Sequence, residues 1–221
     1  MIPVLDTPTF DVDVYSLNKK VQMRPFLVKE QKLFLMAAES EDSKETINIL
    51  NNIKDKLQKY RLILASGSPR RQQFFRDLDL DFEIRLKEIE EIYPKELQRE
   101  EITNYLALLK ADAFDGELQE NEILITSDTI VWHNNKALGK PKNTEDAFEM
   151  LQSLSNSTHE VITSVCFKNK YESKVLYEVT KVSFCKLSDK AIRYYIEKYK
   201  PFDKAGAYGI QEWIGFVGVS K

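Results

Sequence analysis

The sequence predicts an α/β fold built on a mixed sheet for residues 56–221, preceded by an N-terminal appendage of extended and helical segments. Two observations lead to this prediction. From Arg61 onward, short apolar runs typical of strands alternate with longer segments that have the spacing of amphipathic helices. Residues 1–55 do not continue that alternation, so we place the boundary between the two parts near residue 55.

The first half of the alternation contains two strands and two helices. Residues 61–66, RLILAS, suit a buried parallel strand, and residues 82–89 alternate like a half-buried strand. Residues 70–80 and 102–114 have helical spacing. The apolar side chains expected on one side of these helices are Phe74, Phe75 and Leu78 in the first, and Ile102, Leu106, Leu109 and Ala113 in the second.

The second half begins with the strongest strand signal of the sequence. Residues 122–132 are rich in Ile, Thr and Val, and the Asn-Asn pair within 133–139 is typical of a hairpin turn. Residues 143–156 predict a helix, because a polar cap and two early acids suit the positive end of the helix dipole. Two β segments, 160–168 and 175–187, follow around a polar turn.

The domain is expected to end in a further helix. Ser188 is placed to cap this helix, and Pro201 is placed to end it. The tyrosines of this helix are expected to pack in the core rather than to stack on a base.

Composition and charge restrict the class of protein. With 43% hydrophobic and 30% charged residues, the 221-residue chain has the composition of a globular protein. Its formal net charge of -3 argues against nucleic-acid binding, and no apolar stretch approaches the roughly 20 residues that span a bilayer. Since no export signal is visible, we expect a cytoplasmic protein. Two cysteines are too few for a zinc site, and His133 and His159, each beside a turn, are expected to be solvated.

Residues 1–55 form a different kind of segment. They begin with short extended pieces broken by prolines, and residues 26–40, FLVKEQKLFLMAAES, have the pattern of an amphipathic helix. The stretch RPFLVKEQKLFLMAAESED resembles the start of a baseplate protein family of large contractile-tailed phages. Two interpretations stay open, namely an accessory arm and a misjoined reading frame.

The loop SGSPRR after the first strand allows two interpretations. One is a turn with a solvated basic cap. The other is a phosphate cradle, because a helix N-terminus leaves backbone N–H groups unpaired and carries partial positive charge. Ser66 and Gly67 open the loop, and Arg70 and Arg71 add fork-shaped donors that match phosphate oxygens. The loop lacks the Gly-Lys-Ser/Thr ending of a Walker motif.

Asp128 is a second candidate, because it lies inside an otherwise apolar strand where a lone carboxylate is costly to bury. It is either an Asp that caps a loop at the strand end or a general base or metal-linked carboxylate on a rigid strand. Lys140, just past the hairpin, is expected to direct its charge toward the same strand end. Lys110 lies near the apolar face of its helix, where a snorkelling lysine is the simplest interpretation.

The order of five motifs is more specific than any one of them. From about Leu57 to the end, the chain resembles the Maf family of nucleoside triphosphate pyrophosphatases. The resemblance implies an elongated Maf/ITPase-like fold with a central cleft, and hydrolysis between the α- and β-phosphates of a nucleoside triphosphate. The motifs that carry it are LASGSPRR, KEIEEIYP, SDTIV, LGKP and DKAGAYGIQ.

The resemblance also implies roles for individual residues. Asp128 matches the catalytic base of the family, and Glu91 matches an active-site carboxylate. A divalent cation, Mg²⁺ with Mn²⁺ as the alternative, would bind these two carboxylates and the substrate phosphates. The residues that match phosphate contacts are Ser66, Arg70, Lys110 and Lys140.

Three positions resemble the branch of the family that acts on dTTP and UTP, namely Arg71 in the Arg-Arg pair, Thr129 and Gln211. The sister branch prefers 7-methyl-GTP and departs from these residues. An amide such as Gln211 can pair with the carbonyl and N–H edge of a pyrimidine. Modified pyrimidine nucleotides are further candidate substrates.

The chain departs from the pattern of the family at its C-terminal end. The family continues past GFVGVSK through another strand and a final helix, so we expect an exposed sheet edge and reduced stability here. The family often pairs, which makes a homodimer an option. The alternative function is a phage-derived assembly protein that carries an inactive Maf-like domain.

Overall fold

The computed structural model describes a short N-terminal hairpin and almost all of the chain from residue 57 onward. The residues described are 10–14, 19–23, 57 and 59–220. The chain divides into two units, Met1–Asn51 and Asn52–Lys221. In the first unit, β1 (Phe10–Val14) and β2 (Lys19–Met23) pair antiparallel. The helix predicted at 26–40 lies outside the described residues.

The second unit is built on one mixed sheet with the strand order β4-β3-β5-β7-β8, and β6 pairs with the end of β5. The strands are β3 (Arg61–Leu64), β4 (Phe82–Ile84), β5 (Glu122–His133), β6 (Lys136–Leu138), β7 (Thr158–Lys168) and β8 (Ser173–Ser183). β3 runs parallel to both β4 and β5, whereas β5, β7 and β8 pair antiparallel. The predicted mixed sheet is therefore confirmed.

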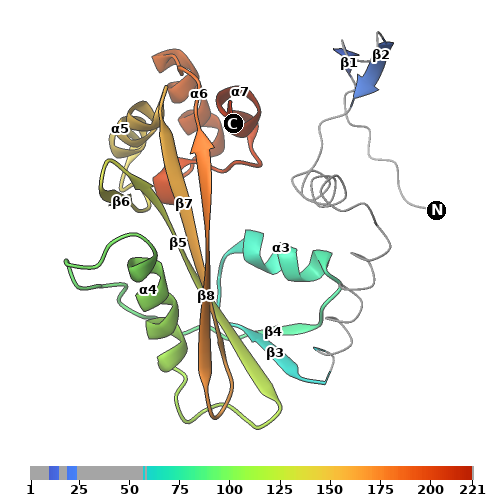
Figure 1. Ribbon diagram of the computed structural model, residues 1–221, viewed down its shortest axis with the longest axis vertical. Helices are drawn as coiled ribbons and strands as arrows, with labels where there is room; N and C mark the ends of the chain where they lie inside the picture. Colours follow the sequence, from blue (N-terminus) through green and yellow to red (C-terminus); the bar gives the residue numbers. More distant parts are fainter. Residues whose placement is uncertain (1–9, 15–18, 24–56, 58, 221) are drawn as a thin grey trace. The chain divides into compact units, whose positions relative to one another are not determined.

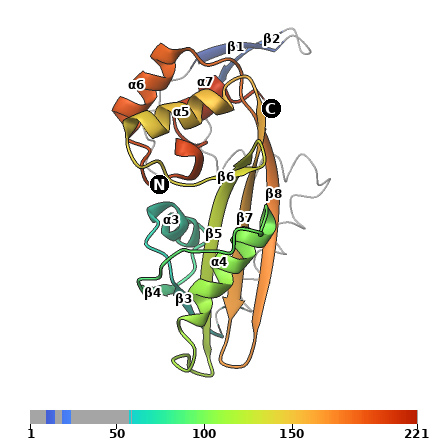
Figure 2. The same cartoon turned by 90° about the vertical axis from the view of Figure 1, so that its left-hand side faces the viewer.

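The helices of this unit lie on both faces and at one end of the long strands (Figures 1 and 2). α4 covers one face and α3 lies on the other, while α5, α6 and α7 gather at the end where β6 lies. The helices are α3 (Pro69–Asp77), α4 (Glu100–Asp112), α5 (Thr144–Leu154), α6 (Asp189–Tyr199), the 3₁₀ turn η1 (Ala205–Ala207) and α7 (Trp213–Gly218). No helix in the described part of the chain is long and apolar enough to cross a membrane.

Local sequence signals fix several boundaries. Asn134 and Asn135 have φ of 49° and 56° and form the two-residue turn between β5 and β6, as predicted. The side chain of Asn143 accepts a hydrogen bond from the N–H of Asp146 at 2.9 Å and caps α5. Ser188 caps α6 in the same way, through the N–H of Ala191 at 3.2 Å.

Two predictions about the first elements are wrong in part. The predicted strand at 82–89 pairs only over Phe82–Ile84. The predicted apolar side of α3 is not buried, because Phe74 is 53% exposed and Leu78 is 38% exposed. Phe75 alone of the three packs inward, with its ring 5.4 Å from that of Phe82. The helical spacing therefore predicted α3, but it did not predict how much of the apolar side of this helix is buried against the sheet.

The prediction of solvated histidines is also wrong. His133 and His159 are 8% and 2% exposed, because the antiparallel register of β5 and β7 brings the ends of both strands together beneath the C-terminal helices. The Nε2 atom of His159 lies 2.7 Å from the hydroxyl of Tyr208, and burial lowers the pKa of His159 to about 4. Both histidines line a cavity of about 410 Å³, which none of the predicted site residues lines.

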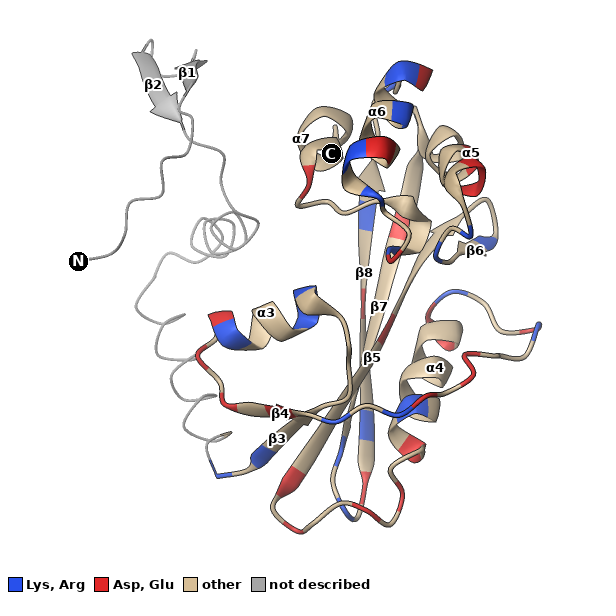
Figure 3. Ribbon diagram, turned by 180° about the vertical axis from the view of Figure 1, so that it is seen from behind, with Lys and Arg blue, Asp and Glu red and all other residues tan. Residues whose placement is uncertain are grey.

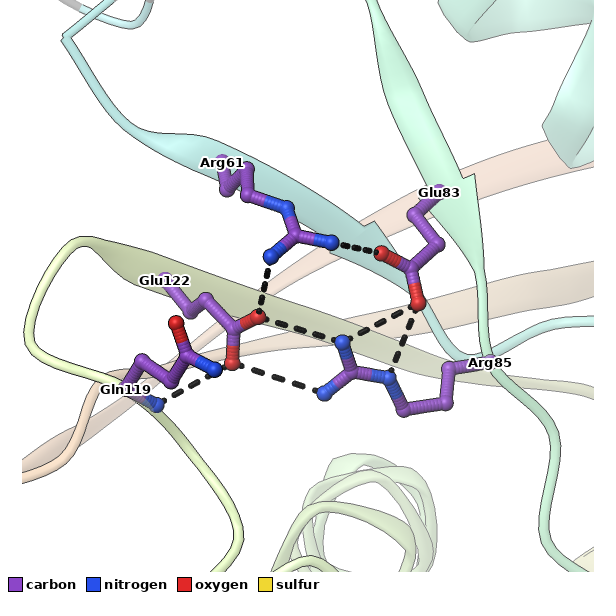
Figure 4. Close-up of polar contacts among 5 residues, drawn as sticks. All are labelled: Arg61, Glu83, Arg85, Gln119 and Glu122. Carbon is purple, nitrogen blue, oxygen red and sulfur yellow. Dashed lines mark hydrogen bonds and ion pairs between the residues drawn. The ribbon is translucent and has the colours of Figure 1, made fainter.

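A buried carboxylate links β3, β4 and β5 at one end of the sheet (Figure 4). Glu122 is 1% exposed and pairs with Arg85 at 3.1 Å and Arg61 at 3.4 Å. It also accepts a hydrogen bond from the backbone N–H of Gln119 at 3.0 Å. Glu83 binds the same two guanidinium groups from β4. The two arginines and the backbone N–H compensate the buried charge of Glu122, and the network holds the starts of β3 and β5 in register.

Glu122→Gln is expected to lower the free energy of unfolding by about 2 kcal/mol, which is the typical contribution of a hydrogen bond to a buried charged group. The hydrogen bond from Arg85 outweighs burial and lowers the pKa of Glu122 from its ordinary value of 4.5. A carboxylate with a lowered pKa stabilises the fold above that ordinary value, and the contribution is lost as the pH falls. Urea unfolding at neutral and acidic pH measures both effects.

Glu83→Gln is the matched control for this prediction. Glu83 binds the same two arginines but its side chain is 39% exposed, so its loss should cost no more than about 1 kcal/mol. Equal destabilisation by the two variants would contradict the role assigned to the buried carboxylate.

Candidate active site

Asp128 lies in the middle of β5, on the face that α4 covers. Its side chain is 10% exposed, and its Oδ1 atom lies 2.7 Å from the Nζ atom of Lys110. The same ammonium lies 2.8 Å from Oε1 of Glu91, in the loop after β4. Lys110 is therefore not a snorkelling lysine, since it binds two carboxylates from different parts of the chain. The structure brings these three predicted site residues into direct contact.

The charge of Glu91 depends on the cations around it. Partial burial by itself would raise the pKa of this carboxyl, but the hydrogen bond and charge of Lys110 outweigh it. The charges of Lys140 and Arg71 act in the same direction, so the pKa of Glu91 is lowered. Lys140, whose own side chain is exposed, acts on Glu91 through its charge alone.

Arg71 reaches the opposite face of the same strand from α3. Its guanidinium donates to the carbonyl of Ser127 at 2.8 Å and to the hydroxyl of Thr129 at 3.1 Å. The Thr129 hydroxyl also lies 3.0 Å from that of Thr163 on β7. Burial lowers the pKa of Arg71, and the charge of Asp128 opposes this shift. Because neighbouring residues of a strand point to opposite faces, Asp128 faces α4 and Thr129 faces α3.

The loop that leads into α3 lies alongside the same part of β5. The N–H of Ala65 donates to the carbonyl of Ile125 at 3.0 Å, so Ser66 lies beside the middle of the strand. Ser66 is 7% exposed, and its hydroxyl accepts a hydrogen bond from the N–H of Ser68 at 3.3 Å. Its carbonyl accepts one from the side chain of Gln72 at 3.2 Å. Figure 3 shows the basic start of α3 next to the long strands.

Arg70 and Gln211 lie apart from the Asp128 group. Arg70 pairs with Asp203 at 3.2 Å, which links the start of α3 to the loop before η1. Gln211 is exposed in the segment between η1 and α7. Within the described part of the chain, neither Gln211 nor Lys140 forms a hydrogen bond or ion pair with the Asp128 group.

Sequence reasoning missed a buried polar cluster beside Gln211. Lys204 is 7% exposed and binds both Asp203 at 2.7 Å and Glu212 at 3.2 Å. Glu212 also accepts a hydrogen bond from the hydroxyl of Tyr195. The available signal was the pair of charges in DKAGAYGIQE, inside a small and apolar stretch. The prediction that the tyrosines of α6 pack in the core is correct for Tyr195, whose buried hydroxyl also has polar partners, but wrong for Tyr194, which is 42% exposed.

The donors present for a divalent cation are two carboxylates. Among the described residues, no group of three or more His, Cys, Asp and Glu side chains is placed to hold a metal. Glu91 and Asp128 both lie against the ammonium of Lys110 and offer oxygen ligands. Mg²⁺ commonly binds one or two carboxylates and completes its shell with substrate phosphates and water, which fits this donor set.

Comparison with known proteins gives the family. A family model described as Maf-like protein matches residues 61–221, which is most of the chain. The chain belongs to this family. The residues of the Maf-like match include every member of the site described above. A second model, described as T4 bacteriophage base plate protein, matches residues 7–64. Both resemblances predicted from the sequence are confirmed.

Curated relatives cover the same Maf-like region. The dTTP/UTP pyrophosphatase of Flavobacterium johnsoniae is 73% identical over 76% of this chain and 87% of its own length. The protein of the same name from Flavobacterium psychrophilum is 66% identical over 76% of this chain and 86% of its own length. Among solved structures, the Staphylococcus aureus Ham1 protein is 18% identical, with a TM-score of 0.41 over 56% of this chain and 71% of that chain.

Proposed function

We propose that the Maf-like domain hydrolyses dTTP and UTP to the nucleoside monophosphate and pyrophosphate. The observation that carries the proposal is the set of contacts on the two faces of β5, where a lysine binds a nearly buried carboxylate on one face and an arginine binds the strand from the other. The names of the Flavobacterium relatives, at 73% and 66% identity, support this substrate class. Modified pyrimidine nucleotides share the same phosphates and base edge and are further candidates.

In this proposal Asp128 is the general base. Its carboxylate takes a proton from a water molecule while the water oxygen forms a bond to the α-phosphorus. The bond from the α-phosphorus to the oxygen that bridges the α- and β-phosphates breaks, and pyrophosphate leaves with the electron pair. Lys110 holds the carboxylate in one orientation, because its ammonium lies 2.7 Å from Oδ1.

Cationic side chains stabilise the charge that builds up on the phosphates. We place the triphosphate at the start of α3, where backbone N–H groups and the partial charge of the helix favour an anion. Arg71 is already held against β5, whereas Arg70 can exchange its exposed partner Asp203 for a phosphate oxygen. The residues proposed to contact phosphates are Ser66, Arg70, Arg71, Lys110 and Lys140.

Glu91 and Asp128 would hold the divalent cation, Mg²⁺ or Mn²⁺, that the family resemblance implies. When bound, the cation neutralises phosphate charge and makes the α-phosphorus easier to attack. The chain itself contributes oxygen donors from two elements, and the cations around Glu91 keep it ionised because they lower its pKa. Thr129 and Gln211 are the proposed contacts to the nucleoside.

Pyrophosphate release by the full chain, with Mg²⁺ present, tests the proposal. We expect faster release from dTTP and UTP than from 7-methyl-GTP. Faster cleavage of 7-methyl-GTP would contradict the pyrimidine assignment, and no release from any nucleotide would favour the alternative of an inactive domain in a phage-derived protein. A cytoplasmic location, a homodimer and the lack of nucleic-acid binding stay predictions of the sequence.

A further inference from the structure

Arg71 carries a charge that no carboxylate neutralises through an ion pair in the described part of the chain. Its guanidinium donates to two neutral oxygens, the carbonyl of Ser127 at 2.8 Å and the hydroxyl of Thr129 at 3.1 Å. Arg70, the preceding residue, is instead paired with Asp203. Of the five N–H groups of an arginine, the two bonds of Arg71 use two, which leaves three for an anion.

The hydroxyl of Thr129 lies between this guanidinium and a second threonine. Because an arginine has only donors, the Oγ1 atom of Thr129 accepts the hydrogen bond from Arg71. Its single proton is then available for another acceptor, and Oγ1 of Thr163 lies 3.0 Å away. Thr129 and Thr163 are opposite each other in the antiparallel register of β5 and β7. Donation from Arg71 to Thr129 and from Thr129 to Thr163 is the order that the positive charge favours, because it turns the negative end of each hydroxyl toward the guanidinium.

The contact between Arg71 and Thr129 depends on where the proton of the threonine points. A hydroxyl whose proton is bound by a second oxygen keeps a lone pair directed at its own donor. Without the oxygen of Thr163 the hydroxyl can turn, and Arg71 then loses one of its two contacts with β5. Pairs of threonines across neighbouring strands are ordinary features of sheets. This pair differs because a guanidinium with no carboxylate partner lies at one end of it.

We propose that Thr163 is a positioning residue that acts through Thr129 and holds the Arg71 guanidinium in the orientation that binds a phosphate oxygen. The inference rests on the proposed function and adds a residue of β7 to the site. Arg71 lies in the first turn of α3 (Pro69–Asp77), where the triphosphate is placed. Thr129 keeps a second lone pair for the nucleoside. The phosphate contact is therefore set by three elements of the fold, namely α3, β5 and β7.

Calorimetric binding of a UTP analogue to the full chain, with Mg²⁺ present, tests the inference. The analogue has an imido bridge between the α- and β-phosphates, so it keeps the phosphate charge but releases no pyrophosphate. Thr163→Val removes the hydroxyl and keeps the branched shape that suits a strand. We expect its Kd to rise roughly fivefold, the factor that corresponds to one hydrogen bond. The kcat/KM for UTP should fall by a similar factor.

Two further variants distinguish positioning from packing. Thr163→Ser loses the methyl group but keeps the hydroxyl, so it should bind the analogue as the wild type does. A packing role would make this variant at least as weak as Thr163→Val, because serine fills less space. Combined with Thr129→Val, the Thr163→Val substitution should change the Kd no further, since Thr163 acts only through Thr129.

Thr158→Val is the matched control. Thr158 is on the same strand and is also opposite a hydroxyl residue of the neighbouring strand, Ser183, with the two hydroxyl oxygens 2.7 Å apart. This pair has no arginine at either end, and Thr158 is exposed. The variant should keep the wild-type Kd and kcat/KM.

The outcomes separate the inference from the proposed function. An active wild-type chain whose Thr163→Val variant binds the analogue normally would overturn the inference and leave the proposed function standing. Weak binding by Thr163→Ser, or a further loss of binding when Thr163→Val is added to Thr129→Val, would do the same. A wild-type chain that releases no pyrophosphate from UTP would contradict the proposed function, and the role of Thr163 would be lost with it.

Discussion

Asp128→Asn is expected to lower the rate of pyrophosphate release from dTTP and UTP by at least about a hundredfold, the contribution typical of a positioned general base. Asparagine keeps the shape of the side chain, and its amide oxygen can still accept the hydrogen bond that Lys110 now gives at 2.7 Å. It cannot take a proton from water. The variant should therefore fold and bind nucleotide but release little pyrophosphate.

The control for this substitution is Asp112→Asn, another exchange of an aspartate that accepts a hydrogen bond from a lysine. Asp112 is on α4, its partner is Lys168 at 2.6 Å, and neither residue is part of the proposed site. Its variant should keep the wild-type rate. If Asp128→Asn retained more than a tenth of that rate while melting normally, another group would have to be the base.

The parts of the fold that were predictable depend on short-range signals. The turn at Asn134 and Asn135 and the caps at Asn143 and Ser188 each depend on a few neighbouring residues, so the sequence was enough to place them. The burial of a helix face depends on what the chain supplies from far away. This is why Phe74 is exposed although its spacing on α3 suggests a buried face.

Long-range pairing also explains the wrong prediction for the histidines. His133 lies next to a turn and His159 near the start of a strand, which looks like solvent-exposed sequence. The antiparallel register between β5 and β7 brings their strand ends together, and Phe184 and Tyr208 then pack against the ring of His159. No pattern within either segment carries that information.

The site was predictable as a set of residues but not as an arrangement. The family resemblance named Asp128, Lys110 and Glu91, yet no spacing in the sequence indicates that one ammonium would bind both carboxylates. The contacts made by Glu212 and Tyr195 were not predicted at all. Their partners are 14 and 17 positions apart along the chain, and each residue alone looks like ordinary surface or core.

Lys110→Met should have the second large effect, because it leaves two carboxylates without their shared cation. Asp128, with a side chain 10% exposed, would lose its ion-pair partner in a nearly buried position, which costs about 3 kcal/mol. The half-exposed Glu91 adds little, since solvent screens its charge. We also expect pyrophosphate release to fall by about a hundredfold or more, because the base is no longer held and a phosphate contact is lost.

Lys168→Met provides a closely matched control. Lys168 also binds two carboxylates, Asp112 at 2.6 Å and Asp115 at 2.5 Å, and its side chain is 12% exposed against 15% for Lys110. Its partners are 47% and 67% exposed, so its loss should cost less than about 1 kcal/mol and leave turnover unchanged. Equal losses of stability in the two variants would show that burial of the partner does not decide the cost.

The pH dependence of the Lys110 effect has a definite sign. Lys110 helps to lower the pKa of Glu91 below its ordinary value of 4.5, so the ion pair stabilises the fold above that pH and loses its contribution as the pH falls. In Lys110→Met, protonation of Glu91 on acidification removes the part of the penalty that comes from this carboxyl. Urea unfolding should therefore show a somewhat larger difference between wild type and variant near pH 7 than below about pH 4.5. A difference that grew on acidification would contradict the stabilisation assigned to the pair of Lys110 with Glu91.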